Sequence, residues 1–320
     1  NTMKKINWGI VGCGRIAAQF CEDLAHTNNG VVYAVAARNG DDATAFASKY
    51  GAANAYEGYQ ALFDDKNVDV VYIATPHNFH FKNASDAIKA GKHVLCEKPI
   101  TVSAEECKQL SLLAKKHDVF LMEAMWTYFL PAIQKAKQWV EQGRIGTIKH
   151  VKADFGYPVP FNPDGREYNP DLAGGCLLDM GIYPLAIANY FLNNDLENLY
   201  VRANIRYKGV EDDVLITANC GDVMVSLATS FQCRLGNGAY IIGDKGYIKI
   251  PDAFRAYECS LYELDDLIEH FEDGRQSQGY SFEAQEVGRL LSENKRESDI
   301  MSHSQSLLLQ SQMERIKALF

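Results

Sequence analysis

The chain has 320 residues, of which 47% are hydrophobic and 23% are charged, and its formal net charge is -9. This length predicts two domains or one large one, and the composition is ordinary for a soluble globular protein. The negative charge and the lack of a long basic run argue against nucleic acid or an anionic membrane surface as a partner. In the sequence we identify no apolar stretch near the ~18 residues of a spanning helix and no signal-peptide pattern, so we expect no membrane association. Asn1 and Thr2 precede Met3 and are left out of the predicted fold.

The eight cysteines are scattered singly, without a Cys-x-x-Cys pair. This spacing is typical of reduced thiols rather than of a disulfide framework or a zinc site. The sequence therefore predicts a cytoplasmic location and no metal centre.

The first motif follows an apolar run, Ile6 to Val11, which ends in Gly12-x-Gly14-x-x-Ala17 and passes into a helical pattern. Gly12 permits a tight turn, Gly14 lets a pyrophosphate approach the backbone, and Ala17 lets the helix pack closely on the strand. The first amide groups of this helix, at Arg15 and Ile16, are placed to bind the diphosphate. The motif predicts a dinucleotide-binding domain.

The second strand, residues 31–37, ends in Arg38. Proteins selective for NAD usually carry an acidic residue here for the ribose 2′-hydroxyl, whereas an arginine binds a 2′-phosphate. Arg38 therefore favours NADP over NAD. The alternative is a solvated surface arginine, and the nearby Asp41 and Asp42 weaken the case for phosphate.

A third strand, residues 68–74, is followed by Thr75, Pro76 and His80. Ligands bind at the carboxyl ends of parallel strands, so we expect these three residues beside the cofactor. His77 and His80 have the spacing of metal ligands, but the sequence offers no third ligand, and packing or hydrogen bonding on the cofactor side is the favoured interpretation.

The rest of the chain has two parts. Helices at 41–50, 81–90 and 103–117 alternate with strands at 92–96 and 118–122, which predicts a doubly wound parallel sheet in residues 1–123. Ser103 and Glu106 have the spacing of a capping box at the start of the third of these helices. Residues 124–320 then read as an α+β domain with helices at 130–142 and 174–192 and in the tail. Its strands, from 147 to 264, are joined by hairpin signals at Gly221-Asp222 and at 243–246, which predicts a large, open, mainly antiparallel meander sheet. Apolar residues in both registers of these strands predict a homodimer through the sheet.

Together with the glycine motif, Glu97-Lys98-Pro99 and Asp179-x-x-x-Tyr183 resemble the glucose-fructose oxidoreductase/inositol dehydrogenase (Gfo/Idh/MocA) family. The runs 123–126 and 174–183 are most similar to the branch that contains dimeric dihydrodiol dehydrogenase and NADP-linked D-xylose dehydrogenase. The resemblance covers essentially the whole chain. It implies a Rossmann domain followed by an α/β domain whose open sheet often mediates dimerisation. It also implies that Lys98 and Tyr183 are catalytic and that Asp179 belongs to the substrate site. Glu97 and Lys98, at the carboxyl end of a strand, are expected to contact the cofactor.

The chemistry of these residues agrees with the resemblance. Oxidation of an alcohol by nicotinamide needs a base for the hydroxyl proton. A tyrosine is a poor base unless a cation favours its phenolate, which is the role expected for Lys98. Asp179 and Tyr183, at i and i+4, are expected on one helix face. The alternative interpretations are a surface lysine and an amphipathic tyrosine.

Substrate contacts are expected from an aromatic group near the domain junction, Trp126, Tyr128, Phe155 and Tyr157, which suits stacking on a sugar ring or cyclic diol. Core packing is the alternative for each ring. Arg166 is either a substrate contact or a solvated loop arginine. We expect a hydride transfer on a sugar, cyclic polyol or trans-dihydrodiol. The alternative is a non-catalytic sugar sensor on the same fold, because fold alone does not fix function.

Overall fold

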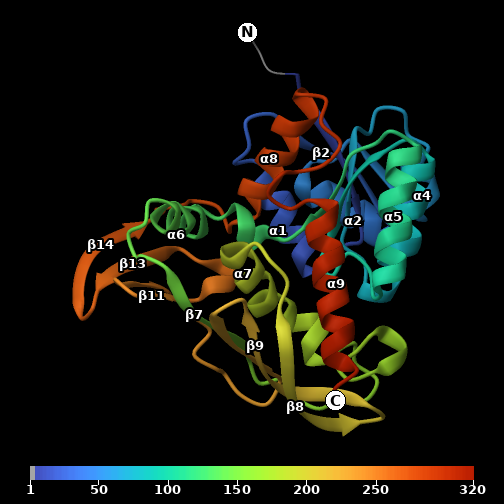
Figure 1. Ribbon diagram of the computed structural model, residues 1–320. Coiled ribbons are helices and arrows are strands. Elements are labelled where there is room, and N and C mark those ends of the chain that lie inside the picture. The colour runs from blue at the N-terminus through green and yellow to red at the C-terminus, as the bar shows by residue number, and fades with distance from the viewer. Residues whose placement is uncertain (1–3) are drawn as a thin grey trace. The chain divides into compact units, whose positions relative to one another are not determined.

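The computed structural model describes residues 4–320, so Asn1 and Thr2 lie outside the described residues (Figure 1). The chain forms two compact units. The first contains the N-terminal part up to Trp126 and residues 275–307, and the second contains residues 127–274 and 308–320. The predicted division after residue 123 differs from these units mainly because residues 275–307 belong to the first unit and not to the second. Helix α8 (Tyr280–Ser292) packs on α1 and β2 there through an apolar stripe at Tyr280, Ala284 and Val287.

The first unit is built on a parallel six-stranded sheet in the order β3-β2-β1-β4-β5-β6. The strands are β1 (Ile6–Val11), β2 (Gly30–Ala37), β3 (Asn54–Glu57), β4 (Val70–Ile73), β5 (His93–Glu97) and β6 (Leu121–Ala124). The predicted doubly wound sheet is confirmed. Strand β3 was not predicted, because it is short and carries polar residues at the sheet edge. The strand order reverses between β1 and β4, where such sheets bind their ligands.

Helices connect these strands as α/β topology requires. They are α1 (Arg15–Leu24), α2 (Gly40–Tyr50), α3 (Tyr59–Phe63), the 3₁₀ turn His77–Phe79, α4 (His80–Lys89) and α5 (Ala104–Lys116). Helices α4 and α5 lie side by side (Figure 1). Helix α5 starts at the predicted N-cap, since Ser103 Oγ accepts the Glu106 N–H at 3.1 Å.

The second unit has an eight-stranded sheet in the order β14-β13-β12-β11-β7-β10-β9-β8. Its strands are β7 (Ile148–Gly156), β8 (Glu197–Tyr207), β9 (Val210–Cys220), β10 (Val223–Ser230), β11 (Ala239–Gly243), β12 (Tyr247–Ile250), β13 (Glu258–Glu263) and β14 (Asp266–Glu272). Both predicted hairpins are antiparallel pairs. A simple meander was the wrong expectation, because β7 lies between β11 and β10 and runs parallel to β10.

Helices α6 (Pro131–Glu141) and α7 (Ile182–Leu192) pack on this sheet, α6 on β12 to β14 and α7 on β7, β10 and β11. Shorter turns are Trp126–Phe129, Pro170–Leu172 and Ala253–Arg255, and Leu177–Gly181 is π-helical. Among the described residues, one helical segment departs from the expectation that no apolar stretch is long enough to span a membrane. It is Pro170–Leu192, which contains an 18-residue window with a mean hydropathy of 1.3. Most of its apolar window, 72%, is buried inside the protein, as in the core helix of a soluble protein.

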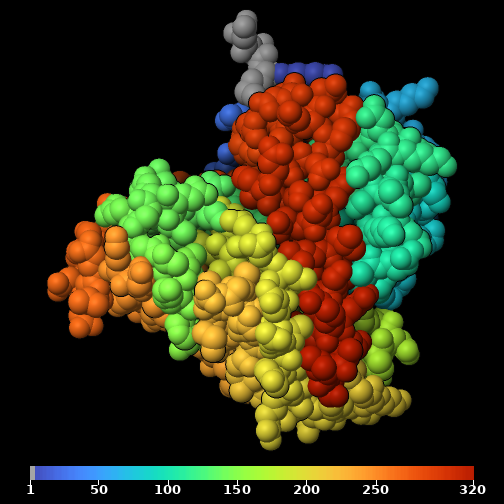
Figure 2. All heavy atoms as spheres, in the orientation of Figure 1, coloured from blue at the N-terminus to red at the C-terminus, as the bar shows by residue number. Residues whose placement is uncertain are grey.

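Helix α9 (His303–Lys317) ends the chain and is divided between the two units. One side of it lies at the surface, in red in Figure 2. Its other side is buried through Leu309, Met313 and Ile316.

Candidate active site

In the first unit, four predicted cofactor residues follow parallel strands at one edge of the sheet. Gly12 follows β1, Arg38 follows β2, Thr75 lies two residues after β4, and Lys98 follows β5. Because neighbouring parallel strands end at the same edge, the sheet brings these four positions to one side.

The glycine turn fits a dinucleotide diphosphate. Gly12 has φ 101°, and a Cβ there would lie 2.9 Å from the carbonyl oxygen of Ala74, so glycine is required. Gly14 precedes α1, and no described atom lies within 4 Å of the position of its missing Cβ. The first turn of α1, which starts at Arg15 and Ile16, carries no acidic side chain. Its amide groups therefore present a positive end next to an open backbone surface.

Arg38 is exposed at the end of β2. The next residue, Asn39, caps α2 by accepting the N–H groups of Asp41 and Asp42 at 2.8 and 3.2 Å. The two aspartates therefore belong to the first turn of α2, where negative charge stabilises a helix. Burial raises the pKa of Tyr59, and the nearby positive charge of Arg38 opposes that rise. An exposed guanidinium at this strand end fits a 2′-phosphate.

His80 links the loop after β4 to the turn after β5. Its Nδ1 lies 2.6 Å from the Pro99 carbonyl oxygen and its Nε2 lies 2.7 Å from that of Thr75. The Thr75 hydroxyl also accepts a hydrogen bond from Asn83. Complete burial lowers the pKa of His80, and the two carbonyl contacts partly oppose this. Since both ring nitrogens face carbonyls, His80 acts as a brace between the two loops.

Lys98 is buried at the end of β5, and its bond to Pro99 is cis. The preceding Glu97 accepts hydrogen bonds from the Tyr72 hydroxyl and, at 3.3 Å, from the Lys98 N–H. Burial raises the pKa of Glu97, while Tyr72 and the Lys98 charge lower it. Glu97 thus holds the turn that carries Lys98.

A second buried carboxyl group was not predicted. Glu283 of α8 is fully buried, and neither of its oxygens accepts a hydrogen bond from a described residue. Burial raises its pKa well above the ordinary value, and the charges of Glu97 and Asp23 add to the rise. Nothing in the sequence indicates that Glu283 is buried, because a glutamate on an amphipathic helix is usually expected on the exposed face.

In the second unit, Tyr183 lies in the first turn of α7 among aromatic rings. Its ring centroid lies 5.4 Å from that of Phe155 and 5.6 Å from that of Phe254. Phe155 and Phe254 contact each other edge to face at 4.1 Å. Phe254 was not predicted, because it lies in a short turn after β12 with no periodic pattern. These rings form an apolar wall around the Tyr183 side chain.

Asp179 and Arg166, predicted separately, form an ion pair with 3.3 Å between Asp179 Oδ1 and Arg166 Nη1. The Nε atom of Arg166 also lies 3.7 Å from Oε1 of Glu167, its neighbour in the chain. Asp179 belongs to the π-helical turn 177–181 and Tyr183 to α7. The i, i+4 spacing therefore crosses a junction between two helix types instead of one α-helix, and π-helical turns are frequent at functional sites.

The remaining predicted aromatic residues, Tyr128, Tyr157 and Trp126, have different surroundings. Tyr128 donates its hydroxyl to the Ala186 carbonyl at 2.6 Å and is a core residue of the second unit. Tyr157 contacts Phe155 edge to face. In the first unit, Trp126 stacks on Tyr280, with 4.4 Å between ring centroids. Tyr280, far away in the sequence, was not predicted.

Comparison with known proteins decides the family. A model of the oxidoreductase family with an NAD-binding Rossmann fold, GFO_IDH_MocA, matches residues 6–125, and the model of the GFO/IDH/MocA C-terminal domain matches residues 133–249. The trans-1,2-dihydrobenzene-1,2-diol dehydrogenase of Danio rerio is 32% identical over 322 residues, which cover 98% of this chain and 96% of the relative. The chain belongs to the GFO/IDH/MocA family.

Two further relatives of this GFO/IDH/MocA protein agree. The D-xylose 1-dehydrogenase (NADP(+)) of Hypocrea jecorina is 38% identical over 200 residues, 56% of this chain and 51% of the relative. The 3-ketoreductase KijD10 of Actinomadura kijaniata, solved with NADP and TDP-benzene, is 25% identical with a TM-score of 0.87, and the match covers 98% of this chain and 97% of that one. The predicted family and branch are confirmed, and the protein is an NAD(P)-dependent oxidoreductase. These comparisons lend no support to the sensor alternative.

Proposed function

We propose that this protein is a dehydrogenase that transfers a hydride between NADP or NAD and the CH–OH carbon of a sugar, cyclic polyol or trans-dihydrodiol. The observation that carries the proposal is the Arg166–Asp179 pair close in sequence to Tyr183, whose ring is walled by Phe155 and Phe254. A charged pair suits hydroxyl groups and an aromatic wall suits the carbon face of a ring.

Each residue has a role in this proposal. The nicotinamide ring, when bound, accepts or donates the hydride. Tyr183 exchanges the proton of the substrate oxygen, and Asp179 and Arg166 orient the substrate hydroxyls. Lys98 binds the cofactor ribose and supports the proton transfer. Trp126 and Phe155 provide apolar contact for the substrate.

For the cofactor, we propose a preference for NADP. The glycine turn at Gly12 and Gly14 and the amide groups of Arg15 and Ile16 receive the diphosphate. Thr75, Pro76, His80 and Glu97 shape the loops beside it. Arg38 binds the 2′-phosphate. Two observations support this role: the Arg38 side chain is exposed, and Asp41 and Asp42 belong to the capped first turn of α2.

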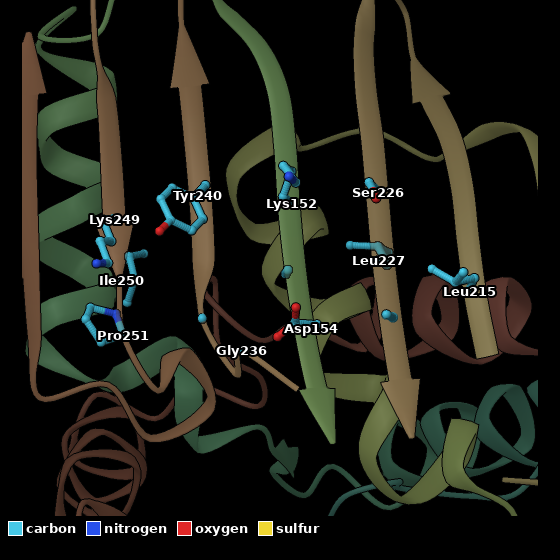
Figure 3. A pocket seen from close by; sticks show the side chains of 13 residues that line it. Lys152, Asp154, Leu215, Ser226, Leu227, Gly236, Tyr240, Lys249, Ile250 and Pro251 are labelled. Atoms are coloured by element: carbon cyan, nitrogen blue, oxygen red, sulfur yellow. The ribbon is translucent and has the colours of Figure 1, made fainter. Parts of the chain in front are cut away.

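We also propose a homodimer through the open face of the second sheet. Figure 3 shows this face, with Lys249, Tyr240, Lys152, Ser226 and Leu215 on adjacent strands and helices behind them. It has a hollow of about 550 Å³. The exposed apolar residues on its strands include Leu215, Met224 and Tyr240, whereas their neighbours Ile216, Val225 and Ile241 are buried. A partner sheet would cover the exposed set.

All eight cysteines are free in the structure, which supports a reducing compartment such as the cytoplasm. Small molecules are the proposed substrates; nucleic acid and membrane are not proposed as partners.

The test is a screen of sugars, inositols and trans-dihydrodiols with NADP and with NAD, read by nicotinamide absorbance. We expect turnover of at least one class and a lower Michaelis constant for NADP. Cofactor binding without turnover of any of these classes would contradict the proposed reaction.

A further inference from the structure

Two consecutive carboxylates at the start of β9, Glu211 and Asp212, have no part in the proposed chemistry. Both are buried, with 3% and 2% of their surface exposed. Neighbouring residues of a strand normally face opposite sides, but the pairing of β8 with β9 shifts register here, since Asn204 pairs with Asp213 and Ile205 with Glu211. Such bulges re-aim side chains and are frequent beside active sites. This bulge buries both carboxylates.

Glu211 holds the beginning of the π-helical turn. Its Oε2 accepts the N–H of Leu177, the first residue of the turn 177–181, at 2.9 Å. The residue before the turn, Cys176, provides no side-chain cap. The amide groups at a helix start need an outside acceptor, and here a carboxylate from a distant strand provides one.

The close approach of Glu211 explains the glycine at 175. Gly175 has φ 122°, and a Cβ on it would lie 2.2 Å from Glu211 Oε1. The Gly175 N–H is donated to the Glu167 carbonyl at 2.7 Å. The turn before Asp179 is therefore held on one side by Glu211 and on the other by the backbone next to Arg166.

Asp212 holds the other arm of the same loop. Its Oδ2 accepts the Tyr168 hydroxyl at 3.3 Å and the side-chain amide of Gln232. Tyr168 lies two residues after Arg166. Thus the two buried carboxylates bind the two segments that carry the Arg166–Asp179 pair.

We propose that Glu211 is a positioning residue for the substrate, which holds the turn 177–181 so that Asp179 stays paired with Arg166. The effect on turnover rests on the proposed function, but the contact itself does not. Glu211 is distinct from the catalytic residues because its carboxylate binds the backbone of Leu177.

The charge of Glu211 makes this holding contact sensitive to pH. Burial raises its pKa to about 7, the bond from Leu177 and the Lys317 ammonium of α9 lower it, and the Asp212 charge raises it. The thiol of Cys176, whose own pKa burial raises, lies in the same cluster, as does the carboxylate of Asp213. A charged carboxylate binds the N–H more strongly than a neutral one. The holding contact should therefore strengthen as the pH rises through about 7.

The first test measures hydrogen exchange of residues 174–181 without substrate, in native protein and in Glu211→Ala, Glu211→Gln and Asp213→Asn. Asp213, next on the strand and half-buried, is the matched control. We expect exchange about tenfold faster in Glu211→Ala, a smaller increase in Glu211→Gln, and no change in Asp213→Asn. Unchanged exchange in a folded Glu211→Gln or Glu211→Ala would overturn the proposal.

The second test uses the best substrate. Glu211→Gln should raise the substrate KM about tenfold with the NADP KM unchanged, and the native rise of substrate KM between about pH 8 and pH 6 should be smaller in this variant. Faster exchange with unchanged substrate KM would overturn the positioning role. If the native protein turns over no sugar, polyol or diol while exchange responds as expected, the proposed function fails and the holding contact stands.

Discussion

At the scale of single residues, some polar groups of the predicted cofactor site bind other parts of the protein, whereas others are exposed. Glu97 and His80 use their polar atoms on neighbouring protein groups. Arg38 is exposed, and the open side of Gly14 adjoins the start of α1.

Tyr183→Phe removes one oxygen and keeps the ring packed on Phe155 and Phe254. Turnover should fall by ~100-fold or more, while NADP affinity stays near native, as expected for loss of a general acid–base. Lys98→Ala should lower both turnover and NADP affinity, since Lys98 is proposed to support the proton transfer and also to bind the cofactor ribose. Steady-state kinetics and NADP titration measure the two effects. Intact turnover in Tyr183→Phe would show that another group moves the proton.

Arg38→Ala should raise the Michaelis constant for NADP about 10-fold or more, because a charged contact of ~1.5–3 kcal/mol is lost. The constant for NAD should barely change, since NAD has no 2′-phosphate. Both constants are measured on the same substrate. Equal changes for the two cofactors would mean that Arg38 does not bind the phosphate.

At the scale of elements, the turn between β1 and α1 and the contacts of β6 show how local geometry serves the site. The two glycines of the turn differ, because one is required by packing and the other faces open space. Glu123 of β6 accepts the Ile100 N–H at 2.8 Å and the Ser306 hydroxyl at 2.6 Å, so it ties the Lys98 turn to α9.

Gly14→Ala should leave the melting temperature near native, since its Cβ meets nothing within 4 Å and its φ of -81° suits alanine. NADP affinity should nevertheless fall at least tenfold, because the Cβ obstructs the diphosphate. Gly12→Ala should lower both the melting temperature and the NADP affinity, since its Cβ would press on the Ala74 carbonyl. Calorimetry and NADP titration check the pair. Native NADP affinity in Gly14→Ala would place the diphosphate elsewhere.

The buried Glu123 predicts a pH dependence of stability. Burial raises its pKa to about 7 from 4.5, so its contribution to stability is complete below pH 4.5 and is lost as the pH rises through about 7. Glu123→Gln keeps an acceptor and adds a donor for Ser306. Its unfolding free energy relative to native should therefore increase by roughly 2–3 kcal/mol from about pH 5 to pH 8. Denaturant titrations at both pH values test this, with exposed Glu105→Gln as control; a pH-independent difference would contradict it.

At the scale of the whole molecule, the second sheet has one face on α6 and α7 and one open face. On the open face Met224 is 57% exposed and Leu215 is 55% exposed. Apolar residues gathered on one open sheet are the feature that favours self-association.

Light scattering at micromolar concentration should give twice the monomer mass for the native protein. Met224→Asp should shift the mass towards the monomer, because a buried charge in an interface is costly. Leu112→Asp, at an equally exposed leucine on α5 of the first unit, should stay dimeric. A monomeric native mass would exclude the proposed interface.

The sequence by itself determined the features that depend on neighbouring residues. The glycine motif, the cap at Ser103, both hairpins and the alternation of strands and helices in the first unit were predicted from local patterns. Each of these needs only the conformational preferences of nearby residues and a periodic burial of one face. The family resemblance added Lys98, Asp179 and Tyr183, which no local pattern would have singled out.

Only the tertiary structure decided which distant segments meet. It paired Arg166 with Asp179, stacked Trp126 on Tyr280, placed β7 between β11 and β10, and returned residues 275–307 to the first unit. It also brought Glu211 to the amide of Leu177. Periodicity shows that a face is buried but carries no information on what covers it, because the partner is selected by the packing of all the elements together.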